Sequence, residues 1–198
     1  MELHALSNGS MSMKEFVDKA IEIYPYVDYI HVREKQRTAR ELVYWIETLL
    51  ENGVPADRLV INDRVDVAYV TGIGGVHLGE TGLSPAVVPA FFKGLRAGKS
   101  VHSPRGAMDA EREGADYLFF GHVFHSTSKE GVSPRGLETF QIINEMVDIP
   151  VIAIGGITPD NIAQVMRKGA AGAAAMSFLW DSEDAKEAAK QLREGWFS

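Results

Sequence analysis

The chain has 198 residues, of which 45% are hydrophobic and 24% charged, an ordinary globular composition with enough length to bury a full core. Its formal net charge of -7 argues against a broad binding surface for nucleic acid or for an anionic membrane. Cysteine is absent, which excludes disulfides, thiolate metal sites and cysteine nucleophiles.

The amino terminus, MELHALSNGS, lacks a basic segment followed by an apolar stretch, and no apolar run anywhere approaches about 18 residues. We therefore expect a soluble cytoplasmic protein that has neither a membrane nor a nucleic acid as partner. Small anionic ligands are compatible with the negative net charge, because a few local cations or a helix N-terminus can hold a phosphate.

Eight short apolar or β-branched runs recur along the chain, each followed by a segment of helix length. The runs are LHALS at 3–7, YIHVRE at 29–34, RLVIND at 58–63, GGVHLGE at 74–80, GKSVHS at 98–103, ADYLFFGH at 115–122, PVIAIGG at 150–156 and AGAAAMS at 171–177. Helical patterns stand between them, for example at 12–24, 38–53, 103–114 and 158–169, several with a Ser or Thr at the start and a Gly at the end.

This alternation implies parallel strands joined by crossover helices, and about eight units point to a closed barrel. The sequence thus predicts an α/β fold in which residues 1–198 form a single-domain (β/α)8 TIM barrel. An open doubly wound sheet is the alternative. It would usually have fewer strands, and no GxGxxG motif follows the first strand here.

Polar residues follow several of these runs at the point where a barrel strand would end. In HVREK, the period of two puts His31, Arg33 and Lys35 on one face of the strand, leading to the barrel mouth. Later runs end in Asn62 and Asp63, in His77, in Ser100 and His102, and in His122. Because barrel enzymes do their chemistry at the carboxyl ends of the strands, we expect these side chains to line a common site.

The segment IPVIAIGGITPDN predicts an anion site after the seventh strand. Gly155 and Gly156 end the strand, and Thr158 can cap the helix that follows. Backbone N–H groups that face an open glycine turn are ready to bind a phosphate. Met176 and Ser177, at the end of the last strand, could complete the site, and a tight turn without a ligand is the alternative.

The stretch GHVFHSTSKEG at 121–131 admits three interpretations: a metal site, an acid/base group beside an anion pocket, or a surface loop. A metal is disfavoured because His122 and His125 lack the helical spacing of HExxH and no carboxylate lies at ligand spacing. Magnesium could use Asp63, but it usually needs a second carboxylate or substrate phosphates. We therefore predict no resident metal, and an acid/base group and a surface loop both stay open.

Several motifs, in order and across nearly the whole chain, resemble those of the thiamine phosphate synthase superfamily and of its sister group, the TenI family of thiazole tautomerases. HVREK corresponds to Q-x-R-x-K of the synthases, INDRVDVA to I-N-D-R-x-D-x-A and GVHLGETG to G-V-H-L-G-Q-x-D. GADYLFFGHVFHSTSK corresponds to G-A-D-Y-x-x-x-G-P-x-F-x-T-x-T-K, and IPVIAIGGI and AAAMS occupy the thiazole-phosphate loops.

Departures from the synthase pattern favour the tautomerase. The synthase Asp that binds Mg²⁺ is Gly82 here, the glutamine that contacts the pyrimidine is His31, and the proline after the sixth-strand glycine is His122, as in the tautomerases. The resemblance then implies an isomerase that shifts a proton in a carboxythiazole phosphate and makes the ring aromatic, a reaction that requires no metal and no cofactor. His122 would take and return the proton, since an ordinary histidine pKa of about 6.5 suits both steps.

The implied ligand is a small-molecule thiazole phosphate carboxylate, bound by residues from several strand ends. These are Arg33, Lys35, Asn62, Asp63, Ser100, Ser126, Ser128, Lys129, Gly155, Gly156, Met176 and Ser177. Lys129 or Arg33 would compensate the carboxylate, and His125 matches no functional position of the family. A homodimer is compatible with the sequence.

Two alternative functions stay open. One is a Mg²⁺-dependent thiamine phosphate synthase, which joins a pyrimidine pyrophosphate to a thiazole phosphate; Gly82 disfavours it, although Glu80 is a nearby carboxylate that could replace the missing ligand. The other is a non-catalytic regulatory protein that binds a thiazole phosphate.

Overall fold

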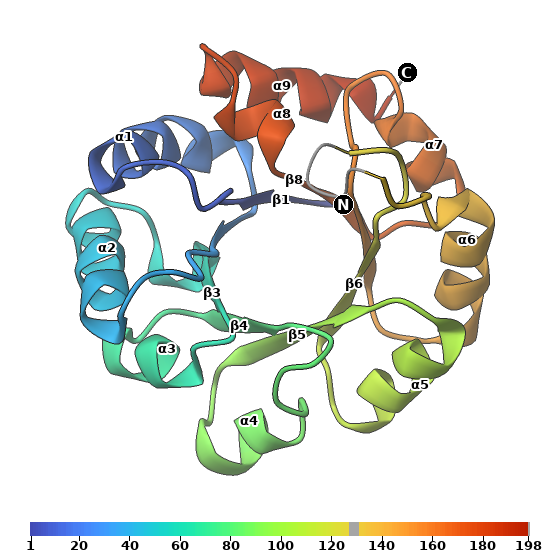
Figure 1. The fold of residues 1–198 in the computed structure, drawn as a ribbon, viewed down its shortest axis with the longest axis horizontal. Coiled ribbons are helices and arrows are strands. Elements are labelled where there is room, and N and C mark those ends of the chain that lie inside the picture. Colours follow the sequence, from blue (N-terminus) through green and yellow to red (C-terminus); the bar gives the residue numbers. More distant parts are fainter. Residues whose placement is uncertain (127–130, 198) are drawn as a thin grey trace.

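The computed structural model describes residues 1–126 and 131–197, and eight parallel strands in it close into a barrel. The strands are β1 (Glu2–Leu6), β2 (Tyr29–Val32), β3 (Leu59–Asn62), β4 (Gly75–Leu78), β5 (Arg96–Val101), β6 (Tyr117–Gly121), β7 (Val151–Ile154) and β8 (Gly172–Ala175). Because β1 pairs with both β2 and β8, the ring in Figure 1 is complete. The expected (β/α)8 barrel is confirmed, and the open doubly wound sheet is excluded.

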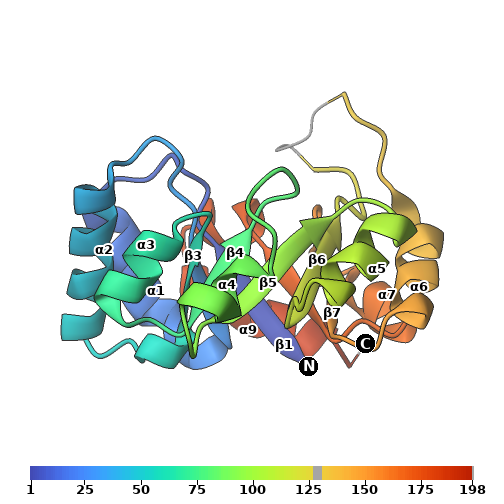
Figure 2. The same cartoon turned by 90° about the horizontal axis from the view of Figure 1, so that it is seen from below.

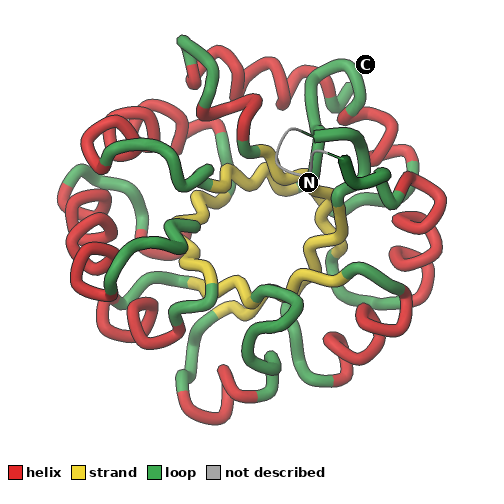
Figure 3. The backbone as a smooth tube through the Cα atoms, viewed as in Figure 1, coloured by secondary structure: helices red, strands yellow, loops and turns green. Residues whose placement is uncertain are grey.

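Helices surround this ring, as the tube drawing in Figure 3 shows. They are α1 (Met13–Ile23), α2 (Ala39–Glu51), α3 (Val65–Thr71), α4 (Val87–Phe91), α5 (Pro104–Arg112), α6 (Gly136–Met146), α7 (Ile162–Arg167), α8 (Ser177–Trp180) and α9 (Ala185–Gly195), with short 3₁₀ turns at Tyr24–Tyr26 and Ala56–Arg58. Within the described ranges, none of the helices has the length and apolar character needed to cross a bilayer.

Parallel closure brings the carboxyl ends of all the strands to one end of the barrel. In the side view of Figure 2, the N-terminus and the last described residues lie at the opposite end, while the described residues just before α6 rise above the carboxyl ends. Side chains that follow the strands in sequence therefore converge at one mouth.

Short sequence signals set where several helices begin. At the start of α2, Glu41 N–H donates to Thr38 Oγ1 at 3.3 Å, and Thr38 N–H donates to Glu41 Oε2 at 2.8 Å. This reciprocal pair satisfies two backbone donors that the first helical turn leaves unpaired. Ser12 and Ser103 cap α1 and α5 through their hydroxyl oxygens, as the serine-start patterns predict.

The cap predicted at Thr158 is wrong, because α7 begins only at Ile162. The Asn161 side chain accepts the Thr158 N–H at 2.9 Å and donates to the Gly156 carbonyl at 2.8 Å. These two hydrogen bonds close a separate turn before the helix. The glycine turn is therefore held by an asparagine side chain and is not the first turn of α7.

The apolar core has two layers on either side of the strands. The outer layer lies between strands and helices and contains large side chains such as Phe16, Trp45 and Phe140. The inner layer fills the barrel with Leu6, Tyr117, Phe119, Ile152 and Ala174. An eight-stranded barrel is just wide enough for such side chains to fill, so its interior is a packed core.

Buried histidines share this interior with the apolar residues. His4 and His31 are 0% exposed and His77 is 1% exposed. The ring centroids of His4 and His31 lie 5.1 Å apart, and those of His31 and His77 lie 5.7 Å apart. Burial disfavours the charged imidazole and lowers the pKa of all three below the ordinary value of 6.5, for His77 to about 3. All three rings are therefore neutral at pH 7.

This burial predicts a specific acid sensitivity. A histidine whose pKa is depressed in the folded state contributes stability that is complete above its unfolded pKa of about 6.5 and is lost as the pH falls below it. The free energy of unfolding should decline there by up to about 1.4 kcal/mol per pH unit for each histidine. His77→Gln should reduce the slope by up to about 1.4 kcal/mol per pH unit between about pH 6 and pH 4, measured by urea unfolding.

His125→Gln is the control for this measurement, because His125 is an exposed loop residue. Its slope should match that of the unmutated chain. A His77→Gln variant with an undiminished slope would show that His77 already binds its proton in the folded state.

Candidate active site

A cavity of about 1110 Å³ opens at the carboxyl ends of the strands. Every predicted site residue that the structure describes lines it: Arg33, Lys35, Asn62, Asp63, Ser100, His122, Ser126, Gly155, Gly156, Met176 and Ser177. Ser128 and Lys129 lie outside the described residues. Pockets for one small ligand usually measure about 300–1,000 Å³, so this cavity has room for more than one small molecule.

Other lining residues were not predicted from the sequence. Asn8 follows β1, Phe119 comes from β6 and Gln191 lies on α9. Asn8 could have been found, because it stands just beyond the first strand end, like the polar residues that were identified. Gln191 carries no such signal, since it is remote from any strand end in the sequence.

The histidines of β2 and β4 do not reach the cavity, contrary to the expectation that they end at the mouth. His31 and His77 face the barrel axis but are buried below the lining residues. His77 Nε2 lies 2.8 Å from the Ser100 hydroxyl, and His77 Nδ1 lies 3.2 Å from the Tyr117 hydroxyl. The buried ring thus holds Ser100, a lining residue, from beneath.

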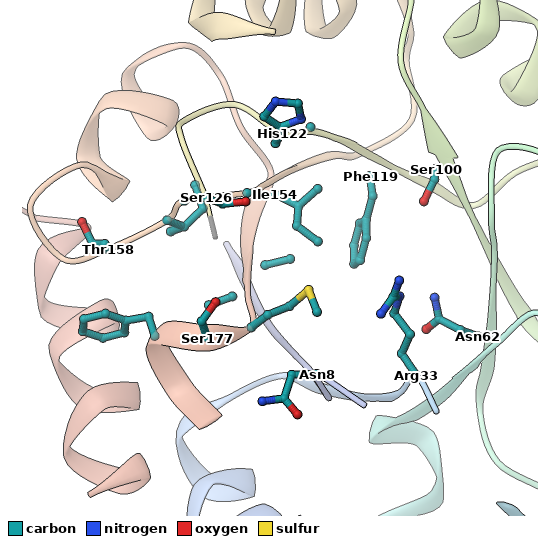
Figure 4. A pocket seen from close by; sticks show the side chains of 18 of the residues that line it. Asn8, Arg33, Asn62, Ser100, Phe119, His122, Ser126, Ile154, Thr158 and Ser177 are labelled. Atoms are coloured by element: carbon teal, nitrogen blue, oxygen red, sulfur yellow. The ribbon is translucent and has the colours of Figure 1, made fainter. Parts of the chain in front are cut away.

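The two sides of the cavity differ in character, as Figure 4 shows. Arg33 and Asn62 lie next to each other on one side, and Ser126, Thr158 and Ser177 lie on the other. The Arg33 backbone is fixed by its N–H, which donates to the Ser7 hydroxyl at 2.8 Å. A long-chain cation therefore stands across the cavity from the hydroxyl groups.

Asp63 holds an unusual backbone conformation at the end of β3. Its φ of 58° lies in the left-handed region, which aspartate tolerates better than most residues. Its N–H donates to the His77 carbonyl at 2.9 Å, and its Oδ1 accepts the Gly79 N–H at 2.7 Å. These two hydrogen bonds tie the β3 end to the β4 end and fix a carboxylate at the mouth.

Gly82 lies directly against this carboxylate. A Cβ at position 82 would stand 2.7 Å from Asp63 Oδ1. The Glu80 carboxylate follows Gly79 and lies 3.7 Å from His102 Nε2. Nearby, Lys99 Nζ donates to the carbonyls of Gly79 and Leu83 at 2.8 and 3.0 Å, which stabilises the loop. The loop after β4 therefore supplies one carboxylate, Glu80, to the cavity that Asp63 also lines.

The glycine turn after β7 is built by close packing. Gly155 and Gly156 have φ values of 99° and 67°, where a side chain is strained. A Cβ on Gly156 would lie 2.2 Å from the His125 carbonyl oxygen, and one on Gly155 would lie 2.4 Å from His122 Cβ. Both positions thus need glycine so that the segment after β6 can cross the turn.

His122 contacts the same segment at its far end. Its Nε2 lies 3.2 Å from the Val132 carbonyl oxygen and 3.0 Å from the Ser133 carbonyl oxygen. Because both partners only accept, Nε2 carries the proton and donates. The His122 carbonyl also accepts the Arg135 N–H at 2.9 Å. These hydrogen bonds attach His122 to the residues that lead into α6.

A closed barrel with a polar cavity at the carboxyl ends of its strands has the architecture of the barrel enzymes. Within that class, the sequence model described as thiamine monophosphate synthase matches residues 4–179. The chain belongs to this family, which confirms the superfamily that its motifs indicated.

Curated relatives are named thiamine-phosphate synthases. That of Chlorobium luteolum is 41% identical over 82% of this chain and 78% of its own length, and that of Natronomonas pharaonis is 37% identical over 94% and 89%. A solved structure, the thiamine phosphate pyrophosphorylase from Pyrococcus furiosus, has a TM-score of 0.83 and 31% identity, covering 99% of this chain and 95% of that chain.

These relatives correct the expected activity. Thiamine-phosphate synthases are transferases, so the predicted isomerase is wrong. The departures at Gly82 and His122 indicate the activity less well than the similarity of the remaining chain. The proton-transfer role of His122 depended on the isomerase and is not carried forward.

The stabilising effect of the His122 hydrogen bonds can be tested directly. His122→Asn shortens the side chain and should separate it from the Val132 and Ser133 carbonyls, so the segment should open more often. We expect trypsin to cleave after Arg135 several-fold faster, measured by mass spectrometry under native conditions. His125→Asn, a substitution in the same segment, should leave that rate unchanged. Equal rates for both variants would show that the His122 hydrogen bonds do not stabilise the segment.

Proposed function

We propose that the chain is a thiamine-phosphate synthase, which joins an aminopyrimidine pyrophosphate to a thiazole phosphate. The observation that carries this proposal is that residues suited to a pyrophosphate and residues suited to a phosphate line the same cavity. Arg33, Lys35 and Asp63 supply charge for a pyrophosphate, and Gly156 and Ser177 supply a place for a phosphate. The curated synthases at 35–41% identity support the same assignment.

The reaction is a substitution at the exocyclic methylene carbon of the pyrimidine. The thiazole ring nitrogen forms a C–N bond to that carbon, the C–O bond to pyrophosphate breaks, and the pyrophosphate leaves with the electron pair. Charge therefore develops on the leaving group. Fixed cations placed where charge develops stabilise the transition state, and we assign this role to Arg33 and Lys35.

The phosphate of the thiazole is assigned to the opposite side of the cavity. The glycine turn at Gly155 and Gly156 lines that side without side chains, so backbone amides can approach a phosphate oxygen closely. Ser177 adds a hydroxyl from the start of α8. Holding the second substrate by its phosphate orients the ring nitrogen toward the carbon that it attacks.

Magnesium fits this site only together with a substrate. Among the described residues, no group of three or more His, Cys, Asp or Glu side chains could hold a metal. Mg²⁺ is commonly bound by one or two carboxylates plus substrate phosphates, and Asp63 with Glu80 meets that requirement. When bound, the ion would neutralise the departing pyrophosphate. Because position 82 is a glycine, the loop after β4 contributes its carboxylate through Glu80.

The assignment of Asp63 predicts a large loss of activity on neutralising its carboxylate. Asp63→Asn keeps the size of the side chain but removes the charge, and should lower kcat/KM for Mg²⁺-dependent thiamine phosphate formation by about 10²–10³-fold. Asp66→Asn is the matched control, since Asp66 pairs with Arg64 outside the cavity. The proposal fails if the unmutated chain forms no thiamine phosphate from the two substrates with Mg²⁺.

Gly82 offers the reverse experiment. Gly82→Asp adds a third carboxylate to Asp63 and Glu80, and the Asp63 side chain must shift because the new Cβ would stand 2.7 Å from its Oδ1. We expect the Mg²⁺ concentration for half-maximal activity to fall several-fold. Gly82→Asn introduces the same bulk without charge and should not lower it. A Gly82→Asp variant that needs as much Mg²⁺ as the unmutated chain would place the ion away from Asp63.

A further inference from the structure

A buried lysine lies beneath the loop after β4. Lys99 stands in the middle of β5 and is only 9% exposed. The period of two along a strand places it on the same face as Ala97 and Val101, which pack in apolar clusters on the helix side of the barrel. Lys99 is thus a charged residue in the interior that does not belong to the cavity lining.

Three backbone carbonyls converge on the side-chain nitrogen of Lys99. Its Nζ lies 2.8 Å from the Gly79 oxygen, 3.0 Å from the Leu83 oxygen and 3.4 Å from the Gly82 oxygen. An ammonium has three N–H donors and can satisfy all three carbonyls, whereas a neutral amine has only two and would turn a lone pair toward a carbonyl oxygen. The three contacts therefore match the charged form.

This buried charge has a cost that its contacts offset. Burial disfavours the charged amine and lowers the pKa of Lys99. The carboxylates of Glu113, Asp63 and Glu80 oppose this effect. A methionine has nearly the same length and would pack at this position without the cost of burying a charge. The cation is therefore explained by the carbonyls that it binds and not by packing.

The three carbonyls lie on both sides of Glu80 in the sequence, since Gly79 precedes it and Gly82 and Leu83 follow it. Two more hydrogen bonds fix the same turn. Gly82 N–H donates to the Gly79 carbonyl at 2.9 Å, and Gly79 N–H donates to Asp63 Oδ1 at 2.7 Å. The backbone around Glu80 is therefore fixed on both sides, while the Glu80 side chain lines the cavity.

We propose that Lys99 is a positioning residue, which fixes the turn at 79–83 before any ion binds and so places Glu80 in the cavity that Asp63 also lines. Loop carbonyls often bind a metal ion such as Ca²⁺, and here the chain supplies the cation itself. The turn should therefore keep its conformation without Mg²⁺. The role of Glu80 toward the ion rests on the proposed function, whereas the attachment of the turn to Lys99 does not.

Nitrogen NMR of the full-length protein with ¹⁵N-labelled lysine tests the contact without any ligand. We expect a side-chain nitrogen that carries three protons at pH 7 and exchanges them with water slowly enough to give a resolved signal. Lys99→Met should remove this signal, and Lys93→Met, at an exposed lysine before β5, should not. A Lys99 nitrogen with the chemical shift of a neutral amine, or without a protected signal, overturns the proposal.

Amide hydrogen exchange tests the attachment of the turn. The Gly79 and Gly82 amides are hydrogen-bonded and should exchange slowly, at the same rate with and without Mg²⁺. Lys99→Met should accelerate both several-fold and leave the Leu118 amide, which donates to the Pro150 carbonyl at 2.9 Å, unchanged. Unchanged rates at the two glycines, protection that needs Mg²⁺, or equal acceleration at Leu118 would each contradict the proposal.

The Mg²⁺ dependence of thiamine phosphate formation tests the consequence. A displaced Glu80 should raise the Mg²⁺ concentration for half-maximal activity several-fold in Lys99→Met and leave the KM of the thiazole phosphate, which is assigned to the glycine turn, unchanged. Lys99→Arg keeps a cation with N–H donors and should lie closer to the unmutated chain.

An unchanged Mg²⁺ requirement in Lys99→Met overturns the positioning role. If the unmutated chain forms no thiamine phosphate but gives the expected NMR and exchange results, only the proposed function is refuted.

Discussion

Closure of eight strands into a ring confines the interior to a space that side chains must fill completely, and the positions of small residues decide which large ones fit. A Cβ on Gly98 of β5 would lie 2.1 Å from the Tyr117 ring, and one on Gly172 of β8 would lie 2.1 Å from the Glu2 carbonyl oxygen. These glycines leave room for Tyr117 and for the close approach of β1. The histidines of β1, β2 and β4 occupy the space that remains.

Buried polar rings are costly unless their hydrogen bonds are satisfied, and both ring nitrogens of His4 and of His77 have partners in the barrel. At the amino end, Glu2 and Arg96 form an ion pair whose guanidinium lies over the Tyr29 and Tyr117 rings at 4.7 and 4.5 Å. At the mouth, Ser100 contacts His77. The cavity lining is therefore supported by side chains that do not themselves line the cavity. This links the interior of the fold to the chemistry at its mouth.

The fold could be predicted from the sequence because most strands are short apolar or β-branched runs and segments of helix length stand between them. Most of the cavity lining could be predicted as well, since polar residues after parallel strands meet at one end. Depth was not predictable: the period of two gives the face of His31 and His77 but not how far they lie below the mouth. The Asn161 turn was missed because a threonine before a helix is a frequent cap, and a nearby side chain that competes for the same N–H leaves no periodic signal.

The activity was harder to predict from the sequence than the fold. Gly82 and His122 are local departures, and each was interpreted through the chemistry of one side chain. The structure places Glu80 on the same loop as Gly82, and it gives His122 a backbone-binding contact. The cavity and the similarity to relatives over the whole chain therefore indicate the activity better than single positions do.

The central claim is that this cavity transfers a pyrimidine unit from pyrophosphate to a thiazole nitrogen. Its most direct test is the stoichiometry of the reaction, followed by ³¹P NMR with the purified chain, both substrates and Mg²⁺. We expect one free pyrophosphate for each thiazole phosphate converted to thiamine phosphate, and no pyrophosphate release when the thiazole phosphate is omitted. Release of pyrophosphate without consumption of the thiazole phosphate, or unchanged spectra of both substrates, would contradict the claim.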